Sequence, residues 1–191
     1  MEISALFRFL AVAERLKCNT RHCDTTSGRR ESVAEHCWRL ALMAWLVRDE
    51  FPDLNMDRVI VMCLTHDLGE AITGDIPTFE KTKSDEQTEG DAVRALFSTL
   101  PDPQGSDLTS IFDEIDAQVT PEAKLFRALD KMEAVMQHNE SDIATWLPLE
   151  YDLQLSYGKA ETDVFPYTRA LKDALNAWTR KKIAEETPES K

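Results

Sequence analysis

Residues 59–70 read VIVMCLTHDLGE, so the most apolar run of the chain leads directly into His66 and Asp67, with Glu70 following. A run of this kind predicts a buried segment, and the polar residues therefore arrive at its inner end. Burying an ionised carboxylate without a partner costs on the order of several kcal/mol. Asp67 therefore needs a proton, a cation or an opposite charge, unless it simply caps a loop.

The length and charge of the chain limit what it can bind. Its 191 residues are most simply one domain, 1–191, long enough to bury about 70% of the surface that the unfolded chain exposes. The formal net charge of −13 disfavours binding to a nucleic acid polymer, because that binding neutralises phosphates with Lys and Arg. A small phosphorylated ligand is still compatible, since one local arginine and a metal outweigh a distant negative surface.

The cysteines and the N-terminus indicate a cytoplasmic protein without a membrane partner. The four cysteines form no C-x-x-C pair, a pattern typical of reduced thiols rather than of a disulfide framework. Residues 1–17, MEISALFRFLAVAERLK, interrupt their apolar positions with charged residues. This predicts an amphipathic helix and neither a signal peptide nor a membrane span.

The apolar periodicity predicts an all-α fold. Glycine is scarce, with six in the chain, and apolar residues recur mostly at spacings of three and four. The expected helices lie at about 33–52, 55–69, 85–99, 108–117, 121–140 and 162–186. Residues 73–84 and 101–107 are expected as loops, residues 141–186 as C-terminal helices without a motif, and residues 187–191 as a frayed tail.

Several residues mark helix starts or surfaces. Ser32 and Glu35 have the spacing of a capping box, Asn55 suits an N-cap, and Pro121 suits a first helical turn. The carboxylates of DEQTEGD, residues 85–91, are expected in solvent. Two tryptophans that share a helix face are expected as core or dimer contacts, namely Trp38 and Trp45.

Four side chains on three expected helices could hold a metal. His36, His66, Asp67 and Asp130 each lie beside an apolar face, and one divalent ion would satisfy both buried carboxylates together with two imidazoles. A single histidine on an apolar face is more often a core residue, and Asp130 could instead pair with a neighbouring Lys or Arg. The metal hypothesis is favoured because the four residues fall where the helices converge.

The order of these residues resembles that of the HD-domain metal-dependent phosphohydrolases, which are all-helical proteins named for the His66-Asp67 dipeptide. The nearer resemblance is to their 5'-deoxynucleotidase (YfbR-like) branch. It rests on RRESVAEH at 29–36, HDLGEAITGDIPT at 66–78 and the helix that carries Asp130, within a motif-bearing core of residues 5–140. The resemblance implies a compact multi-helix HD-domain bundle with the metal site at the convergence of its central helices.

The resemblance also implies roles for single residues. The metal ligands it implies are His36, His66, Asp67 and Asp130. The catalytic residues it implies are Glu70, Asp75 and Arg21, with Arg21 orienting the phosphate. The residues that it implies for substrate binding are Arg21, His22, Asp75, Ile76, Pro77 and Thr78. Helical relatives of this size often pair, which suggests a homodimer.

His22 departs from the YfbR-like pattern, which has a tryptophan that excludes a 2'-hydroxyl. The smaller ring leaves three alternatives open. It could admit ribose, donate a hydrogen bond to phosphate, or be a solvated loop residue. Glu70 likewise could manage protons in the site or face solvent at a helix end.

The function expected from these residues is removal of the 5'-phosphate from (deoxy)nucleoside 5'-monophosphates by metal-activated water. One divalent cation is expected, and the mixed nitrogen and oxygen ligands suit Mn, Co, Fe, Ni or Zn better than Mg. A second metal of the dinuclear HD oxygenases is disfavoured, because only His22 and His138 are left as further histidine ligands and His138 lies about 12 Å along the helix from Asp130. The alternatives are a phosphohydrolase for another small phosphorylated metabolite, or a non-catalytic helical protein with a structural metal.

Overall fold

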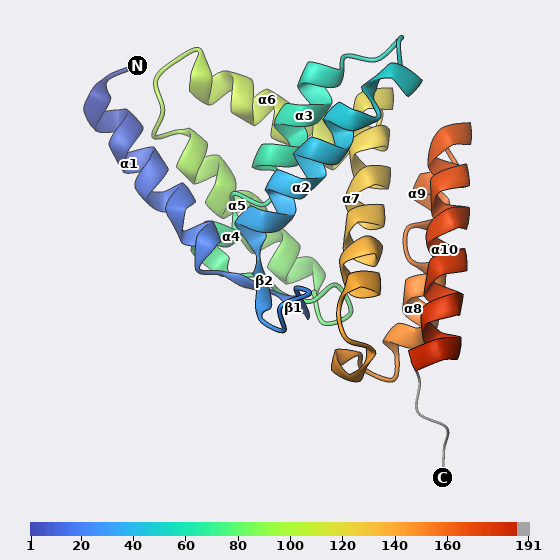
Figure 1. Ribbon diagram of the computed structural model, residues 1–191. Helices are drawn as coiled ribbons and strands as arrows, with labels where there is room; N and C mark the ends of the chain where they lie inside the picture. The colour runs from blue at the N-terminus through green and yellow to red at the C-terminus, as the bar shows by residue number, and fades with distance from the viewer. Residues whose placement is uncertain (187–191) are drawn as a thin grey trace.

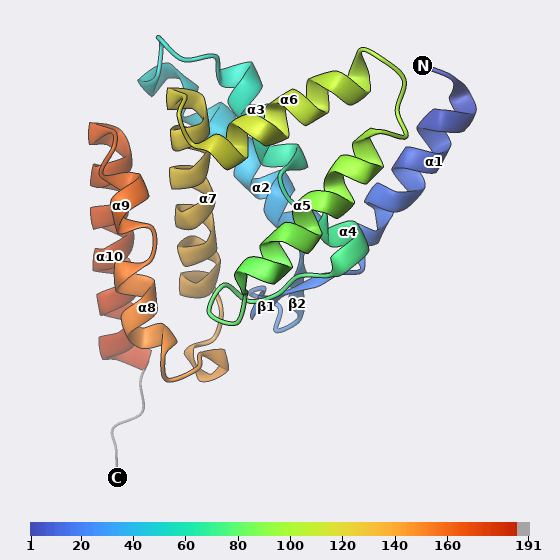
Figure 2. The same ribbon diagram turned by 180° about the vertical axis from the view of Figure 1, so that it is seen from behind.

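The computed structural model describes residues 1–186 as a helical bundle with one small antiparallel hairpin (Figures 1 and 2). The all-α prediction is confirmed, and the expected frayed tail lies outside the described residues. The helices are α1 (Ile3–Ala13), α2 (Val33–Leu46), α3 (Met56–Thr65), α4 (Glu70–Thr73), α5 (Lys83–Phe97), α6 (Gln104–Ala117), α7 (Pro121–Glu140), α8 (Glu150–Ser156), α9 (Lys159–Thr162) and α10 (Pro166–Glu186). The strands are β1 (Thr20–Asp24) and β2 (Arg30–Ser32), and the 3₁₀ helices are Glu14–Lys17, Arg48–Glu50 and Ile143–Thr145.

The long helix α7 forms the centre of the molecule. It lies between α2 and α3 on one side and α8 to α10 on the other, as Figure 1 shows. Leu125, Leu129 and Met132 on α7 are fully buried, and both neighbouring groups of helices pack against this helix. Because other helices cover α7 on both sides, Asp130 on this helix lies inside the bundle.

The predicted helix starts are confirmed by their caps. The Ser32 hydroxyl accepts a hydrogen bond from the backbone N–H of Glu35, whose carboxylate accepts one from the backbone N–H of Ser32 at 2.9 Å. Asn55 caps α3 by accepting from the backbone N–H of Arg58 at 3.1 Å, and Pro121 lies in the first turn of α7. These caps fix where the helices that position His36, His66 and Asp130 begin.

Two helices end earlier than predicted. α2 stops at Leu46 and is followed by a 3₁₀ turn over Arg48–Glu50 instead of continuing to Pro52, because the backbone leaves the α-helical region at Val47, with φ of −94° and ψ of 3°. α3 stops at Thr65 instead of near Gly69. Beyond it the hydrogen bonds tighten, since Leu68 N–H bonds to Thr65 O at 3.2 Å, and the separate short α4 follows.

The hairpin of β1 and β2 was not predicted. Its strands are only five and three residues long, and most of its residues are polar, so neither helical nor strand periodicity could indicate it. The turn between the strands uses Gly28 at a φ of 78°, a conformation that glycine adopts without strain. The hairpin packs against α7 and brings Arg21 towards that helix.

Further boundaries and environments differ from expectation. α6 begins at Gln104 rather than at about 108, and the last helix begins at Pro166 rather than at about 162. Trp38 and Trp45 are 62% and 49% exposed, so the interpretation of them as core residues is wrong. Among the described residues, no helix has the length and apolar character needed to cross a membrane.

The buried Lys172 on α10 should make the free energy of unfolding depend on pH. Only 4% of this residue is exposed, its Nζ donates to Gln154 O at 2.9 Å, and burial lowers its pKa to about 8. The unfolded chain has the ordinary lysine pKa of about 10.4. Between about pH 8 and 10 the unfolded state therefore binds more protons, and the free energy of unfolding of the wild type rises with pH.

We expect Lys172→Met to raise the free energy of unfolding at pH 6.5 by about 1–2 kcal/mol, because the lost hydrogen bond offsets part of the gain from removing a buried charge. At pH 9.5 the advantage should shrink. Urea unfolding at both pH values measures this, with the exposed Lys181→Met as the control. An advantage that is equal at both pH values would contradict the prediction.

Candidate active site

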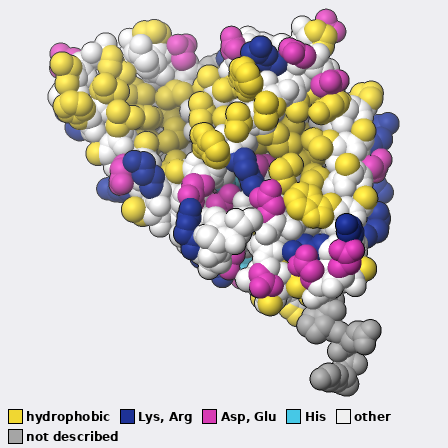
Figure 3. Space-filling model, viewed as in Figure 1, with side chains coloured by type: hydrophobic (Ala, Val, Ile, Leu, Met, Phe, Trp, Pro, Cys, Tyr) yellow, Lys and Arg dark blue, Asp and Glu magenta, His cyan; other side chains and the backbone are white. Residues whose placement is uncertain are grey.

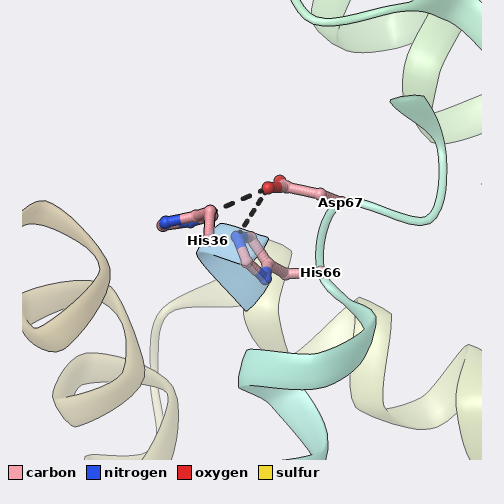
Figure 4. Close-up of side chains that lie close together, drawn as sticks. All are labelled: His36, His66 and Asp67. Atoms are coloured by element: carbon pink, nitrogen blue, oxygen red, sulfur yellow. Dashed lines mark ion pairs between the residues drawn. The ribbon is translucent and has the colours of Figure 1, made fainter. Parts of the chain in front are cut away.

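Four predicted residues meet where α2, the end of α3 and α7 come together. The Nε2 atom of His36 lies 3.2 Å from Asp130 Oδ1 and 3.8 Å from Asp67 Oδ2. The Nε2 atom of His66 lies 3.0 Å from Asp67 Oδ2 and 3.8 Å from Asp130 Oδ1. Figure 4 shows the Asp67 carboxylate beside both imidazoles, joined to each by an ion pair.

The other nitrogen of each imidazole is already engaged. The Nδ1 atom of His36 bonds to the carboxylate of Glu133, which is fully buried on α7. The Nδ1 atom of His66 lies 3.1 Å from Cys63 O, and only its N–H can bond to that carbonyl. Both Nε2 atoms therefore face the two aspartates: with a proton they can donate to a carboxylate, and without one they can bind a cation. Carboxylates and carbonyls impose this orientation on metal-binding histidines.

This donor set fits a divalent cation. Ligands about 2.0–2.2 Å from an ion lie about 2.9–3.5 Å from one another, close to the separations found between the imidazole nitrogens and the carboxylate oxygens. If both Nε2 atoms lack a proton, nitrogen and oxygen lone pairs face each other across these distances, and a cation removes that repulsion. Two nitrogens and two oxygens form a set that transition metals accept.

The two aspartates have depressed pKa values. Burial alone would raise the pKa of Asp67, but the imidazoles of His66 and His36 outweigh it and hold the pKa at about 2. Burial also acts against ionisation of Asp130, and its hydrogen bond with His36 lowers the pKa well below the usual range. Among the described ion pairs, Asp130 contacts the two imidazoles rather than a neighbouring Lys or Arg.

Glu70 is buried beside this centre, so the alternative of a solvent-facing residue is wrong. Only 5% of it is exposed, and its Oε2 has no hydrogen-bond partner among the described residues. Burial, followed by the charges of Asp67 and Asp75, raises the pKa of Glu70 to about 10. Glu70 can therefore carry a proton at neutral pH.

Glu89 was expected in solvent, and the structure corrects this expectation. Carboxylate oxygens of Asp67, Glu70 and Glu89 lie within 4.8 Å of one another, and Glu89 forms an ion pair with Lys81 at 2.5 Å. The reason is the close approach of α5 to the turn after α3. A Cβ at Gly69 would lie 2.7 Å from the Cγ of Glu89, so only glycine leaves this space.

Arg21 is held in place by two carboxylates that sequence reasoning missed. Its Nη1 donates to Glu31 Oε2 at 2.8 Å and to Glu133 Oε2 at 3.4 Å. Asp75 makes no described hydrogen bond to Arg21. Glu133 could have been found, because it lies one helical turn beyond Asp130 on the same face of α7. Glu31 offered no signal, since its position depends on the unpredicted hairpin.

The predicted substrate residues line one solvent-open cavity with an empty volume of about 540 Å³. These residues are Arg21, His22, Asp75, Ile76, Pro77 and Thr78. The opposite wall comes from α8 and the residue after it, with Glu150, Leu153, Gln154 and Tyr157. The C-terminal segment, for which the sequence provided no motif, therefore closes one side of this cavity.

His22 belongs to the cavity wall, and the alternative of a solvated loop residue is wrong. Its Nε2 lies 3.6 Å from the Oε1 of buried Glu150, and its ring meets Phe79 edge-on at a centroid distance of 5.4 Å. The same Glu150 contacts His138 Nε2 at 3.0 Å and accepts from the backbone N–H of Leu147 at 2.7 Å. The carboxylate thus lies beside the ring of His22 in the cavity wall.

Residues 13–171 match the family described as the HD domain, which covers most of the chain. The chain belongs to the HD-domain family. The 5'-deoxynucleotidase HDDC2 of Mus musculus is 33% identical over 141 residues, covering 72% of this chain and 70% of the relative. The chain is therefore similar, over most of its length, to a relative that is named as a 5'-deoxynucleotidase.

Solved structures share the fold. A predicted metal-dependent phosphohydrolase from Magnetospirillum magnetotacticum MS-1 has a TM-score of 0.74 at 27% identity, covering 96% of this chain and 92% of that one. The cyanophage S-2L HD phosphohydrolase DatZ, bound to dA and one catalytic Zn²⁺ ion, has a TM-score of 0.60 at 22% identity, covering 92% and 96%. The second comparison shows the HD-domain fold alone.

The bond between Glu133 and His36 should affect the affinity of this HD-domain protein for a divalent cation. We expect Glu133→Gln to weaken binding of a divalent cation about 10- to 100-fold, because the carboxylate that orients His36 and keeps its Nε2 available is lost. Competition with a chromophoric chelator measures the affinity, and circular dichroism checks the fold.

Glu140→Gln is the matched control, since Glu140 shares the Arg39 contact but not the His36 contact. Equal affinities for the two variants would show that the bond to His36 does not matter for the cation.

Proposed function

We propose that this HD-domain protein removes the 5'-phosphate from nucleoside 5'-monophosphates, with deoxynucleotides as its main substrates. Its membership of the family and its similarity to 5'-deoxynucleotidases make it a metal-dependent nucleotide phosphohydrolase. The observation that carries the finer proposal is the position of Arg21. The Arg21 guanidinium lies in the wall of the solvent-open cavity and is anchored to Glu133, which also holds His36.

The metal ligands in this proposal are His36, His66, Asp67 and Asp130. One divalent cation, with Mn, Co, Fe, Ni or Zn preferred over Mg, would supply a lowered pKa for a coordinated water and polarise a phosphoryl oxygen. The buried bonds from Nδ1 of both histidines support the assignment, because they hold the rings in the orientation that such a site needs.

Arg21 would bind the phosphate. Its Nη1 is taken by Glu31 and Glu133, so the Nη2 and Nε groups are left to donate to phosphoryl oxygens. Because Arg21 is already positioned by these two carboxylates, Asp75 is left to orient the sugar of the nucleotide. Asp75 lines the cavity, which supports this role.

Glu70 would manage the proton. Its unpartnered oxygen lies beside Asp67, where it can orient the attacking water, and its raised pKa lets it hold a proton for the departing 5'-oxygen of the sugar. General acid and base catalysis of this kind is typically worth about 100- to 10,000-fold in rate.

The proposal predicts the substrate profile. After removal of metal and separate addition of Mn²⁺, Co²⁺ or Zn²⁺, we expect phosphate release from deoxynucleoside 5'-monophosphates in a matched panel with ribonucleotides. Release from both series would identify His22 as a gate that admits ribose. Release from deoxynucleotides alone would show that selection against the 2'-hydroxyl survives without the tryptophan of the YfbR-like pattern.

Glu70→Gln is the control for this experiment. It should lower phosphate release at least about 100-fold while keeping metal affinity, because the amide keeps its size but cannot exchange the proton. Loss of metal from this variant would make Glu70 a ligand. No release by the wild type with any metal would overturn the nucleotidase proposal.

We also propose that the protein forms a homodimer through an apolar face on α1, α2 and α3. Hydrophobic side chains gather over α1 and α2 in the view of Figure 3. The exposed members of this face are Ile3, Phe7, Leu10, Trp38, Leu42, Trp45, Leu46 and Leu64. An exposed apolar surface of this extent is typical of a protein interface.

Replacing both tryptophans tests the dimer. We expect wild-type protein at micromolar concentration to have twice the 21.7 kDa mass of one chain in light scattering, and the double variant Trp38→Glu/Trp45→Glu to have the mass of one chain. The control is Val164→Glu, which changes an exposed residue outside this face. A monomeric wild type would contradict the proposal.

The cytoplasm is the proposed location. Cys18, Cys23, Cys37 and Cys63 are free thiols, and three of them are buried, as expected for a protein of a reducing compartment. Recovery of the native protein in a membrane or extracytoplasmic fraction would contradict this proposal.

A further inference from the structure

The hydroxyl of Tyr157 joins three parts of the chain beside the cavity. It lies 3.1 Å from Thr78 Oγ1, in the loop between α4 and α5, and Lys131 Nζ on α7 donates to it at 2.7 Å. Lys131 directly follows Asp130 in the sequence. A residue of the C-terminal segment thus connects the loop that lines the cavity with the helix that carries a proposed metal ligand.

The donors of this chain of hydrogen bonds define the arrangement in which the Thr78 hydroxyl faces the cavity as a donor. The ammonium of Lys131 can only donate, so one lone pair of the Tyr157 oxygen accepts from it. The phenolic hydrogen can then be donated to Thr78 Oγ1, since either of these two hydroxyls can be the donor. With its oxygen accepting from Tyr157, the Thr78 hydroxyl keeps its own hydrogen, which it can donate to a ligand in the cavity that both residues line.

The backbone is shaped to allow this contact. Gly158 has a φ of 72°, and a Cβ at this position would lie 2.5 Å from the Cβ of Lys131. The missing side chain lets the turn after α8 lie directly on α7. The Lys131 ammonium is also 4.5 Å from the centroid of the Tyr157 ring, a favourable cation–π distance, so the lysine and the ring hold each other in place.

We propose that Tyr157 is a positioning residue that orients the Thr78 hydroxyl as a hydrogen-bond donor to an oxygen of the bound nucleotide. The inference rests on the proposed function and extends it to a residue of the C-terminal segment. Phosphate and sugar oxygens are both acceptors that this donor can serve. Tyr157 acts through Thr78 and on the bound ground state, so its loss should weaken binding more than it slows the reaction.

The test is a double-mutant cycle on phosphate release. Tyr157→Phe removes the hydroxyl and keeps the ring, and we expect KM for deoxyadenosine 5'-monophosphate to rise about 5- to 20-fold with kcat within about twofold, the loss expected for one hydrogen bond. Thr78→Val should raise KM by at least as much. Adding Tyr157→Phe to Thr78→Val should then change KM by less than about twofold, because the two residues act as one unit.

Tyr151→Phe is the matched control. Tyr151 lies on α8 and packs edge-on against Trp146 at a centroid distance of 5.6 Å, and its hydroxyl has no hydrogen bond among the described contacts, so KM should not change. Thermal melting of all variants separates a loss of fold from a loss of binding. An unchanged KM in Tyr157→Phe overturns the inference, and so do fully additive effects in the double variant.

A further measurement separates this inference from the proposed function. If the wild type releases no phosphate, the proposed function fails, and calorimetric binding of deoxyadenosine 5'-monophosphate decides the inference. A Kd that is about 5- to 20-fold higher for Tyr157→Phe than for the wild type supports it. Equal Kd values, or no binding to the wild type, overturn it.

Discussion

The carboxylate of Glu133 is the point on which the site depends. It has no solvent exposure, and it bonds to the Nδ1 of His36, to Arg21 and, at 2.6 Å, to Arg39. Burial acts to raise the pKa of Glu133, but His36 and the two guanidinium groups hold it at about 2. One buried charge thereby fixes both an imidazole of the candidate metal centre and the guanidinium proposed for the phosphate.

This arrangement explains how a strongly acidic chain can present a site for an anion. Removing one partner of a buried ion pair typically costs about 3–5 kcal/mol, because the other charge is left without compensation. The pairs among Arg21, Glu31 and Glu133 are therefore held firmly, although most charged residues of the chain lie on the surface. The local geometry, not the net charge of the chain, decides what the cavity can bind.

Much of this organisation could be predicted from the sequence, because its signals are local. The capping box at Ser32, the N-cap at Asn55 and the helical periodicity around Asp130 all act within a few residues. The misses depend on distant partners. The environment of Glu89 comes from the close packing that Gly69 permits, and the role of Glu133 comes from residues 94 to 112 positions away. Periodicity carries no information about such pairings.

The wall formed by α8 has a consequence for how this protein can diversify. The groups assigned to the chemistry lie on residues 21–133, whereas Glu150, Leu153, Gln154 and Tyr157 of the cavity wall come from a separate, later segment. Substitutions in that segment can reshape the space for a sugar or base without disturbing the buried charges around His36. Part of the wall that shapes the ligand space is thus encoded apart from the residues assigned to the chemistry, so this part can drift while those residues are kept.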